Sequence, residues 1–179
     1  MAFFLSTNGI LHSYQFDYLQ GFENSSRLEK TKIHSESERP HAPKMYFEQI
    51  DLYAIDIMNA PVFSMSQTTH LDIIREEMKS KNIRHIPIVS EKKLLGMISD
   101  RDLLKLDLSG VFSFLKAEEV MTTVIIVVEE ETPITMIARV LVQENISALP
   151  VINKKHELTG IISRTDILKA VIGHRLVAK

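Results

Sequence analysis

The chain has 179 residues, 45% of them hydrophobic, and a formal net charge of −2, which suits one compact domain or two small domains sharing a core. This charge, without a patch of interleaved basic and aromatic residues, speaks against nucleic-acid binding. The chain has no cysteine, hence no disulfide, thiolate zinc site or thiol nucleophile, and no apolar run long enough to span a membrane, so we expect a soluble cytoplasmic protein.

Residues 1–20 predict an N-terminal β-hairpin. Asn8-Gly9 is the strongest two-residue turn signal, because both residue types tolerate positive φ. A two-residue period places six side chains toward one face: Phe3, Leu5, Ile10, His12, Tyr14 and Phe16. A lone hairpin is only marginally stable in water. We therefore expect this face to dock on the main body, a second subunit or a partner.

Residues 21–47 predict a polar linker, because charges of both signs alternate with serines and with Pro40 and Pro43. Beyond it, residues 54–105 return with similar chemistry as residues 117–169, so we divide the rest into repeats at 48–109 and 110–179. The clearest match runs from Gly96-Met97-Ile98-Ser99-Asp100-Arg101-Asp102 to Gly160-Ile161-Ile162-Ser163-Arg164-Thr165-Asp166. Two such units are expected to bury their apolar faces against each other.

Each repeat predicts the order helix, strand, helix, strand, strand, helix. The expected strands lie at 62–65, 86–89 and 94–99, and again at 124–128, 149–152 and 158–163. Helix signals accompany them: Thr132 before Pro133 predicts an N-cap, Thr69 with Asp72 predicts a capping pair, and Asn82 and Asn145 suit left-handed helix ends. The final helix of each repeat should begin at the serine of the repeated turn.

These features resemble the CBS domain, named after cystathionine β-synthase, which occurs in tandem pairs. The resemblance covers about residues 50–171 and rests on the paired Gly-x-x-Ser-x-x-Asp turns and on Ile86-Pro87 and Leu149-Pro150. It implies an α/β (α+β) fold, in which two pseudosymmetric units each pack a small β-sheet with helices. It also implies a regulatory module for adenosine-containing ligands such as AMP, ADP, ATP or S-adenosylmethionine. Family members usually form homodimers through their helices, so we expect a homodimer.

The repeated turn has chemistry that suits such a ligand. The Ser99 hydroxyl can donate to a phosphate oxygen, and the Asp102 carboxylate can accept from both vicinal ribose hydroxyls. Ser163 and Asp166 repeat this pair, and Gly96 and Gly160 allow a ring or a neighbouring backbone to approach closely. The alternative is that Ser-x-x-Asp only caps the following helix. Capping and binding can coexist in one turn.

The two copies differ where the family holds phosphate. The first has Arg84-His85 before its Ile-Pro pair, whereas the second has Ser147-Ala148 before Leu-Pro. We hypothesise that the cleft with Asp102 prefers a phosphorylated adenosine and that the Asp166 cleft takes a less anionic ligand. For Arg84 the alternative is a solvated cation at a helix end. The resemblance places adenine between apolar strand residues, and the full candidate set is Ser99, Asp102, Ser163, Asp166, Arg84, His85, Arg101, Arg164, Ile86, Pro87, Gly96, Met97, Pro150 and Gly160.

The sequence predicts no catalytic and no metal site. None of the seven histidines shares a ligand-like spacing with another on one predicted helix face, and no nucleophile stands beside a base. We therefore expect a protein that is not an enzyme and requires no cofactor. An adenine nucleotide would be its regulatory ligand, and a protein that the sequence does not identify would be its partner. The competing hypothesis is a ligand-independent scaffold for dimerisation or docking.

Overall fold

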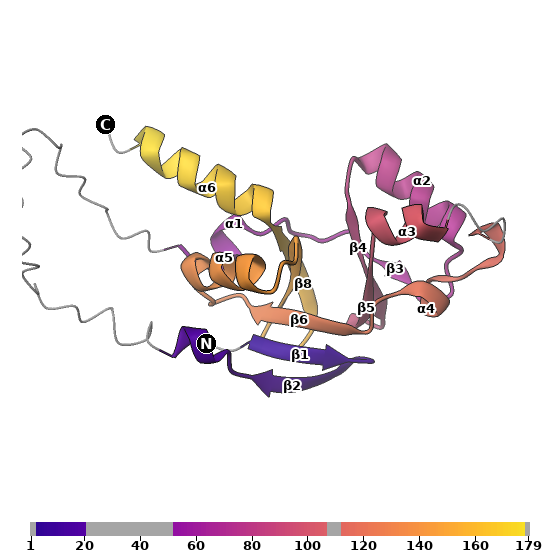
Figure 1. Ribbon diagram of the computed structural model, residues 1–179, viewed down its shortest axis with the longest axis horizontal. Coiled ribbons are helices and arrows are strands. Elements are labelled where there is room, and N and C mark those ends of the chain that lie inside the picture. The colour runs from indigo at the N-terminus through magenta and orange to yellow at the C-terminus, as the bar shows by residue number, and fades with distance from the viewer. Residues whose placement is uncertain (1–2, 21–51, 107–111, 178–179) are drawn as a thin grey trace, which may run out of the picture.

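The computed structural model describes residues 3–20, 52–106 and 112–177, so the linker expected at 21–47 lies entirely outside the described residues. The chain forms two small sheets, each packed with helices, as Figure 1 shows. The predicted α/β fold is thus confirmed. The first repeat comprises α1 (Ala54–Ile57), β3 (Met65–Ser66), α2 (Leu71–Lys81), β4 (His85–Ser90), β5 (Lys93–Ser99) and α3 (Asp100–Leu106). The short helix η4 (Phe112–Phe114) follows, and the second repeat has α4 (Ala117–Val120), β6 (Val124–Glu129), α5 (Ile134–Gln143), β7 (Ala148–Ile152), β8 (Leu158–Ser163) and α6 (Arg164–Val177).

The two repeats share one strand pattern. In the first, β3 pairs in parallel with β4, which pairs antiparallel with β5; in the second, β6, β7 and β8 do the same. Asn82 and Asn145 adopt left-handed backbones with φ of 53° and 52°, as predicted for helix ends. The predicted starts of the long helices were wrong. The N-cap residues are His70 for α2 and Pro133 for α5, and neither cap forms a side-chain hydrogen bond.

The repeats exchange their N-terminal segments. The amide of Ala54 in α1 donates to the Thr132 carbonyl of the second repeat over 2.8 Å, and that of Ala117 in α4 donates to the Thr69 carbonyl of the first over 2.8 Å. Each short helix therefore lies against the opposite repeat. The apolar clusters show the same exchange, since Ala54 belongs to the core under α5 and Ala117 to the core under α2.

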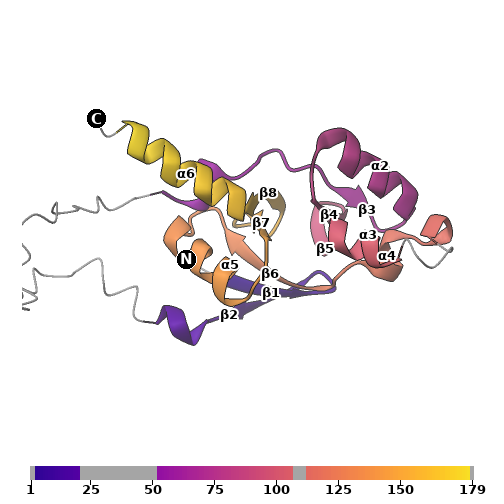
Figure 2. The same cartoon turned by 45° about the horizontal axis from the view of Figure 1, so that its top comes forward.

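The predicted N-terminal hairpin is present, with strands β1 (Phe3–Thr7) and β2 (Ile10–Tyr14) followed by the short helix η1 (Asp17–Leu19). It docks on the main body through a strand edge. β1 pairs antiparallel with β6 and extends the second sheet to the order β2-β1-β6-β7-β8. Figure 2 shows the hairpin lying along β6 at the lower border of the second repeat.

The expected single buried face of the hairpin was wrong in part. Phe3 and Phe16 are buried, but Ile10 is 63% exposed and Tyr14 is 46% exposed. The other face of the hairpin also packs, because Phe4 and Leu11 contact a cluster of Leu94, Ile125, Val127 and Ile152 that joins the two repeats. A strand that pairs along its edge can bury side chains on both faces, so the two-residue period alone did not identify the docking mode.

Candidate functional site

The two Ser-x-x-Asp turns have the same geometry. In the first, the Ser99 hydroxyl donates to Asp102 Oδ2 over 2.6 Å, and the Ser99 amide donates to the same oxygen over 3.0 Å. In the second, the Ser163 hydroxyl and amide donate to Asp166 Oδ2 over 2.5 and 2.9 Å. Each aspartate lies in the first turn of the helix that follows its serine, so the capping interaction expected as the alternative is present in both copies.

The strand residues expected beside adenine lie on two different faces. Ile86 is fully buried in the core under α2 and α3, whereas its strand neighbour Pro87 pairs with Met97 on the other face of the sheet. Met97 packs at the junction of the two repeats. Pro150 is buried and pairs with Ile161 at the equivalent position of the second sheet. Met97 therefore lies at the junction with the opposite repeat, whereas Ile86 acts as a core residue.

The two glycines of the repeated turn accept contacts from the exchanged segments. A Cβ built on Gly96 would lie 2.6 Å from Met121 Sδ and 2.9 Å from the carbonyl oxygen of Thr122. Gly160 faces Met58 in the same way, with Cγ only 2.9 Å from such a Cβ. A neighbouring segment thus occupies the space that a missing Cβ leaves open, as one of the two expectations for these glycines stated. The sequence indicated the methionines only through their recurrence 63 residues apart (121 − 58 = 63).

His85 joins the two repeats. It is the strand partner of Ser99, and its Nε2 lies 2.8 Å from the hydroxyl oxygen of Ser147 in the second repeat. Burial lowers the pKa of His85, while the carboxylate of Asp100 opposes this effect. The first residue of β4 therefore meets the residue that precedes β7. No sequence signal pointed to this contact, because the two residues are not equivalent in the repeat.

The lowered pKa of His85 has a consequence for stability. Because the unfolded chain binds a proton at this side chain more readily than the folded protein, stability should fall as pH drops below the ordinary histidine value of about 6.5. We expect wild type to lose more free energy of unfolding between pH 7.5 and 5.5 than His85→Asn, which cannot titrate. Urea denaturation at a series of pH values measures this, and parallel curves for the two proteins would contradict it.

The arginines of the candidate set have different positions. Arg164 caps the end of α5, since its Nε donates to the Ile146 carbonyl over 2.8 Å and its Nη2 donates to the Leu141 carbonyl over 2.9 Å. Arg84 and Arg101 are exposed, and both lower the pKa of His85 through their charge. The structure thus brings His85, Arg84, Arg101 and the Ser99 turn together, whereas Arg164 is held at a helix end.

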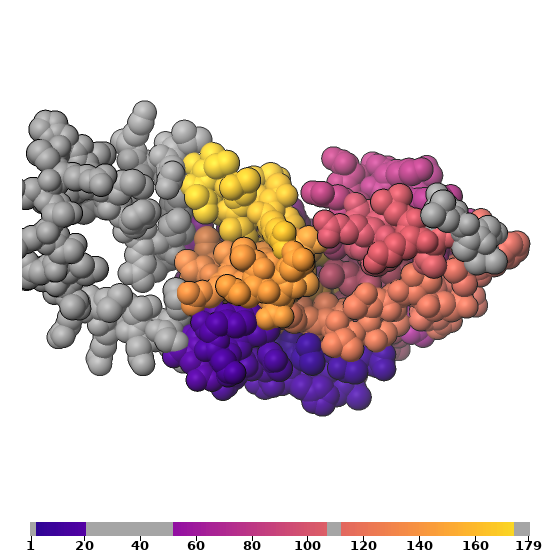
Figure 3. All heavy atoms as spheres, viewed as in Figure 1, coloured from indigo at the N-terminus to yellow at the C-terminus, as the bar shows by residue number. Residues whose placement is uncertain are grey.

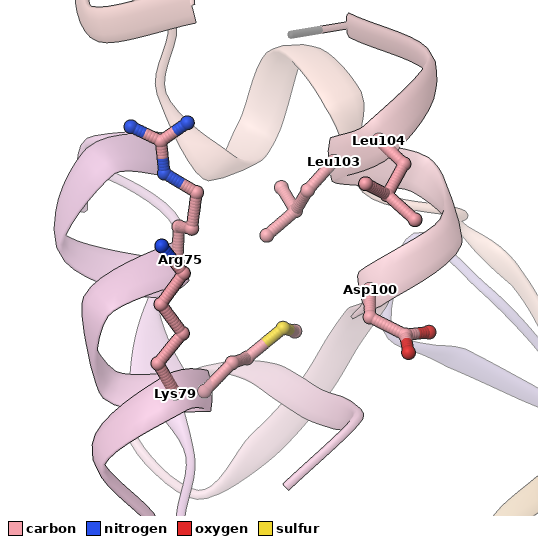
Figure 4. Close-up of a pocket in the computed structure, with 6 residues that line it drawn as sticks. Arg75, Lys79, Asp100, Leu103 and Leu104 are labelled. Atoms are coloured by element: carbon pink, nitrogen blue, oxygen red, sulfur yellow. The ribbon is translucent and has the colours of Figure 1, made fainter. Parts of the chain in front are cut away.

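A separate pocket of about 170 Å³ lies between α2 and α3, as Figure 4 shows. Its walls are Met78, Leu103 and Leu104, with the polar side chains of Arg75, Lys79 and Asp100 around them. Neither Ser99 nor Asp102 lines it. Leu104 is 69% exposed, so this pocket opens on an apolar helical surface and touches the repeated turn only at Asp100.

Among residues 3–20, 52–106 and 112–177, no three His, Asp or Glu side chains gather as a metal site would require. No helix within these ranges is both long and apolar enough to cross a membrane.

Comparison with known proteins identifies the family. The CBS domain family matches residues 54–109 and 117–173, which include both Ser-x-x-Asp turns. The chain belongs to the CBS domain family. A CBS pair is typically a regulatory module and not a catalytic one.

Two curated CBS-containing relatives illustrate the range of architectures. A CBS domain-containing protein of Dictyostelium discoideum is 28% identical over 134 residues, covering 65% of this chain and 88% of that protein. The homoserine O-acetyltransferase of Methanohalobium evestigatum is 30% identical over 120 residues, covering 66% of this chain but only 24% of the enzyme. The chain therefore spans about a quarter of that enzyme's length, and the match covers only its CBS part.

Solved structures of CBS proteins share the fold. The CBS domain pair of protein MJ0100, in complex with 5′-methylthioadenosine and S-adenosyl-L-methionine, is 27% identical with a TM-score of 0.63, covering 69% of this chain and 98% of that one. AcuB of Vibrio cholerae, assigned to acetoin utilization, is 30% identical with a TM-score of 0.65, covering 70% of this chain and 94% of its own. Protein MJ1225 of Methanocaldococcus jannaschii is 26% identical with a TM-score of 0.62, covering 68% and 48%.

Proposed function

We propose that this CBS pair is a regulatory module that binds adenosine-containing ligands such as AMP, ADP or ATP and signals their presence to a partner protein. The observation that carries this proposal is the pair of matching turns, in which Asp102 and Asp166 each present a carboxylate beside a serine hydroxyl. The MJ0100 pair, whose ligands are two adenosine derivatives, supports the same ligand class.

Binding would exchange one hydrogen bond for others. The Asp102 oxygen that now accepts from the Ser99 hydroxyl would accept from the ribose diol instead. The released hydroxyl could then donate to a phosphate oxygen. Because hydrogen bonds to charged groups contribute roughly 1.5–3 kcal/mol each, two new bonds to the carboxylate can outweigh the loss of the internal one. The turn would thus serve as a helix cap and as a ribose site in succession.

The two clefts should differ in their preference for phosphate. The Ser99 turn has His85 as strand partner, with Arg84 and Arg101 close by. At the Ser163 turn the strand partner is Ala148, and Arg164 is bonded to the end of α5. We therefore place a phosphorylated adenosine at Asp102 and a less anionic adenosine derivative at Asp166.

Asp102→Asn tests the first cleft with little change in side-chain volume. We expect it to weaken AMP binding by at least about tenfold, because an amide offers one neutral acceptor oxygen and a donor group where the carboxylate offers two charged acceptor oxygens. Arg84→Ala should weaken AMP binding while leaving adenosine binding unchanged. Isothermal titration measures both, and Thr165→Ala, which changes an exposed residue of the second turn and leaves the first turn intact, is the control. An unchanged AMP affinity in Asp102→Asn would remove the ribose role, and an unchanged affinity in Arg84→Ala would remove Arg84 from the site.

A homodimer through the helices is the expected assembly. Four helices present apolar side chains that are about half exposed or more: Ile73 on α2, Leu104 on α3, Val142 on α5, and Leu168 and Ile172 on α6. The pocket between α2 and α3 lies within this surface. A second copy that covers these helices would bury the exposed apolar area.

The competing function is a scaffold that uses the fold without a ligand. The capping bonds favour it, because they give the Ser–Asp pairs a role in the absence of nucleotide. A thermal-shift panel with AMP, ADP, ATP, NADH and S-adenosylmethionine separates the two functions. A ligand at about 100 times its Kd should add roughly 2.7 kcal/mol of stability. A melting temperature unchanged by all five compounds would favour the scaffold.

A further inference from the structure

The outer edge of β2 carries no partner strand within the described part of the chain. The five-stranded sheet begins at β2, and Figures 1 and 3 show the hairpin at the lower border of the molecule. Other sheet margins are protected, since Asn59 bridges to Ile161 on β8 and Thr122 bridges to Met97 on β5. The remaining open margin, at β3, is only two residues long.

Strand β2 also lacks the features that normally protect an edge. Its residues, Ile10-Leu11-His12-Ser13-Tyr14, include no lysine, carboxylate or proline, and its register with β1 continues over five residue pairs without a bulge. Ile10 and Tyr14 are 63% and 46% exposed. An unprotected neutral edge strand with exposed apolar residues is prone to pair with another strand.

The direction of the free backbone groups follows from the hairpin register. Thr7 and Ile10 flank the two-residue turn, where the pair next to the turn exchanges hydrogen bonds and the following pairs alternate. Leu11 and Ser13 therefore fall in the pairs that do not bond with β1. Their N–H and C=O groups point away from β1, toward the open edge.

This arrangement is complementary to itself. Around a twofold axis at His12, antiparallel pairing sets Leu11 opposite the partner's Ser13, so that all the outward backbone groups of both residues find partners. Ile10 then faces the partner's Tyr14, which is a favourable pairing of a β-branched and an aromatic side chain. We propose that β2 is a self-association edge, at which two copies of the chain pair antiparallel around His12 and join their sheets.

This contact does not involve the helices or the repeated turns, so it is independent of the proposed nucleotide site. A contact over five residues per chain is small compared with the ~1,600 Å² of a standard stable interface. The association should therefore be weak, and it should depend on protein concentration.

Because the chain has no cysteine, a single introduced thiol reports on the axis. In His12→Cys the two thiols would face each other in a non-hydrogen-bonded pair with Cα atoms about 4.5 Å apart, within disulfide range. In the matched control Ile10→Cys, they would lie about 13 Å apart along the strands, too far to bridge. Under mild oxidation we expect a covalent dimer from His12→Cys, roughly tenfold more than from Ile10→Cys. Equal yields from the two variants, or no covalent dimer, would overturn the proposed axis.

A second pair of variants tests the edge in solution. Ser13→Pro removes an outward N–H that β1 does not use, so the hairpin should remain folded while the contact between copies is lost. Ser13→Thr keeps the N–H and favours a strand. Sedimentation equilibrium at rising concentration should show a lower mean mass for Ser13→Pro than for wild type and Ser13→Thr. Identical masses for all three proteins, or an edge occupied only by a different protein, would contradict pairing between copies.

Discussion

Gly96→Ala should lower the free energy of unfolding by about 3 kcal/mol, the upper end of what overpacking a core typically costs. The added Cβ would lie 2.9 Å from the Thr122 carbonyl oxygen, and this oxygen belongs to the main chain. Thr122 cannot simply withdraw, because it accepts from and donates to the backbone of Met97 over 3.0 Å in each direction. The substitution should therefore separate the exchanged segment from β5, which would loosen the contact between the repeats.

Two other glycines provide matched controls for this result. In Gly160→Ala the three atoms nearest to the added Cβ all belong to the flexible Met58 side chain, so we expect a loss of about 1 kcal/mol. Gly173→Ala meets nothing within 4 Å in α6 and should add up to about 1 kcal/mol through helix propensity. Guanidinium denaturation of the three variants measures their free energies of unfolding and so ranks their stabilities. If Gly96→Ala were no more destabilised than Gly160→Ala, the Thr122 backbone would not be the rigid neighbour that the geometry indicates.

Phe16→Ala should cost about 3–4 kcal/mol, as expected for removal of a large buried ring. Phe16 is 7% exposed and lies edge-on to Phe3 at a centroid distance of 5.4 Å and to Tyr14 at 4.8 Å. The backbone just after it is held as well, since Arg139 of α5 donates to the Tyr18 carbonyl over 2.9 Å. The loss should appear in the unfolding of the whole domain, because this cluster is continuous with the core of the second repeat.

Ile10→Ala is the control for the hairpin, because Ile10 is 63% exposed and its truncation should change stability by less than about 0.5 kcal/mol. Hydrogen exchange distinguishes the alternatives. If Phe16→Ala released the amides of β1 while those of β6 kept wild-type protection, the hairpin would be an independent attachment and not part of the sheet.

The fold could be predicted from the sequence because it is repeated. A single Gly-x-x-Ser-x-x-Asp stretch is compatible with many helix starts, but two in register fix the strand on one side and the helix on the other, as β5–α3 and β8–α6 confirm. The helix starts were less predictable. Thr69 and Thr132 have the right side chains for capping, yet both carbonyls accept hydrogen bonds from the exchanged helices, and the caps fall one residue later.

The sequence identified residues of the site but not the contacts that these residues make with distant parts of the chain. Ser99 and Asp102 were identified from their spacing, and their mutual hydrogen bond follows from it. Arg164 was included in the candidate set because it follows the serine of the second turn. Its actual bonds are to carbonyls at the end of α5, and only the three-dimensional approach of that helix reveals them. The contact between His85 and Ser147 likewise depends on how the sheets meet.

Because the repeats exchange their short helices α1 and α4, neither repeat can fill its core with its own residues alone. If the polypeptide were cut between α3 and α4, the glycine of each fragment would lose its methionine contact to the other fragment. Met121 packs on Gly96, and Met58 packs on Gly160. Such fragments should associate when mixed, because each carries the short helix that packs on the other. The CBS family matches the chain twice, yet the two repeats complete each other's packing and should fold as one unit.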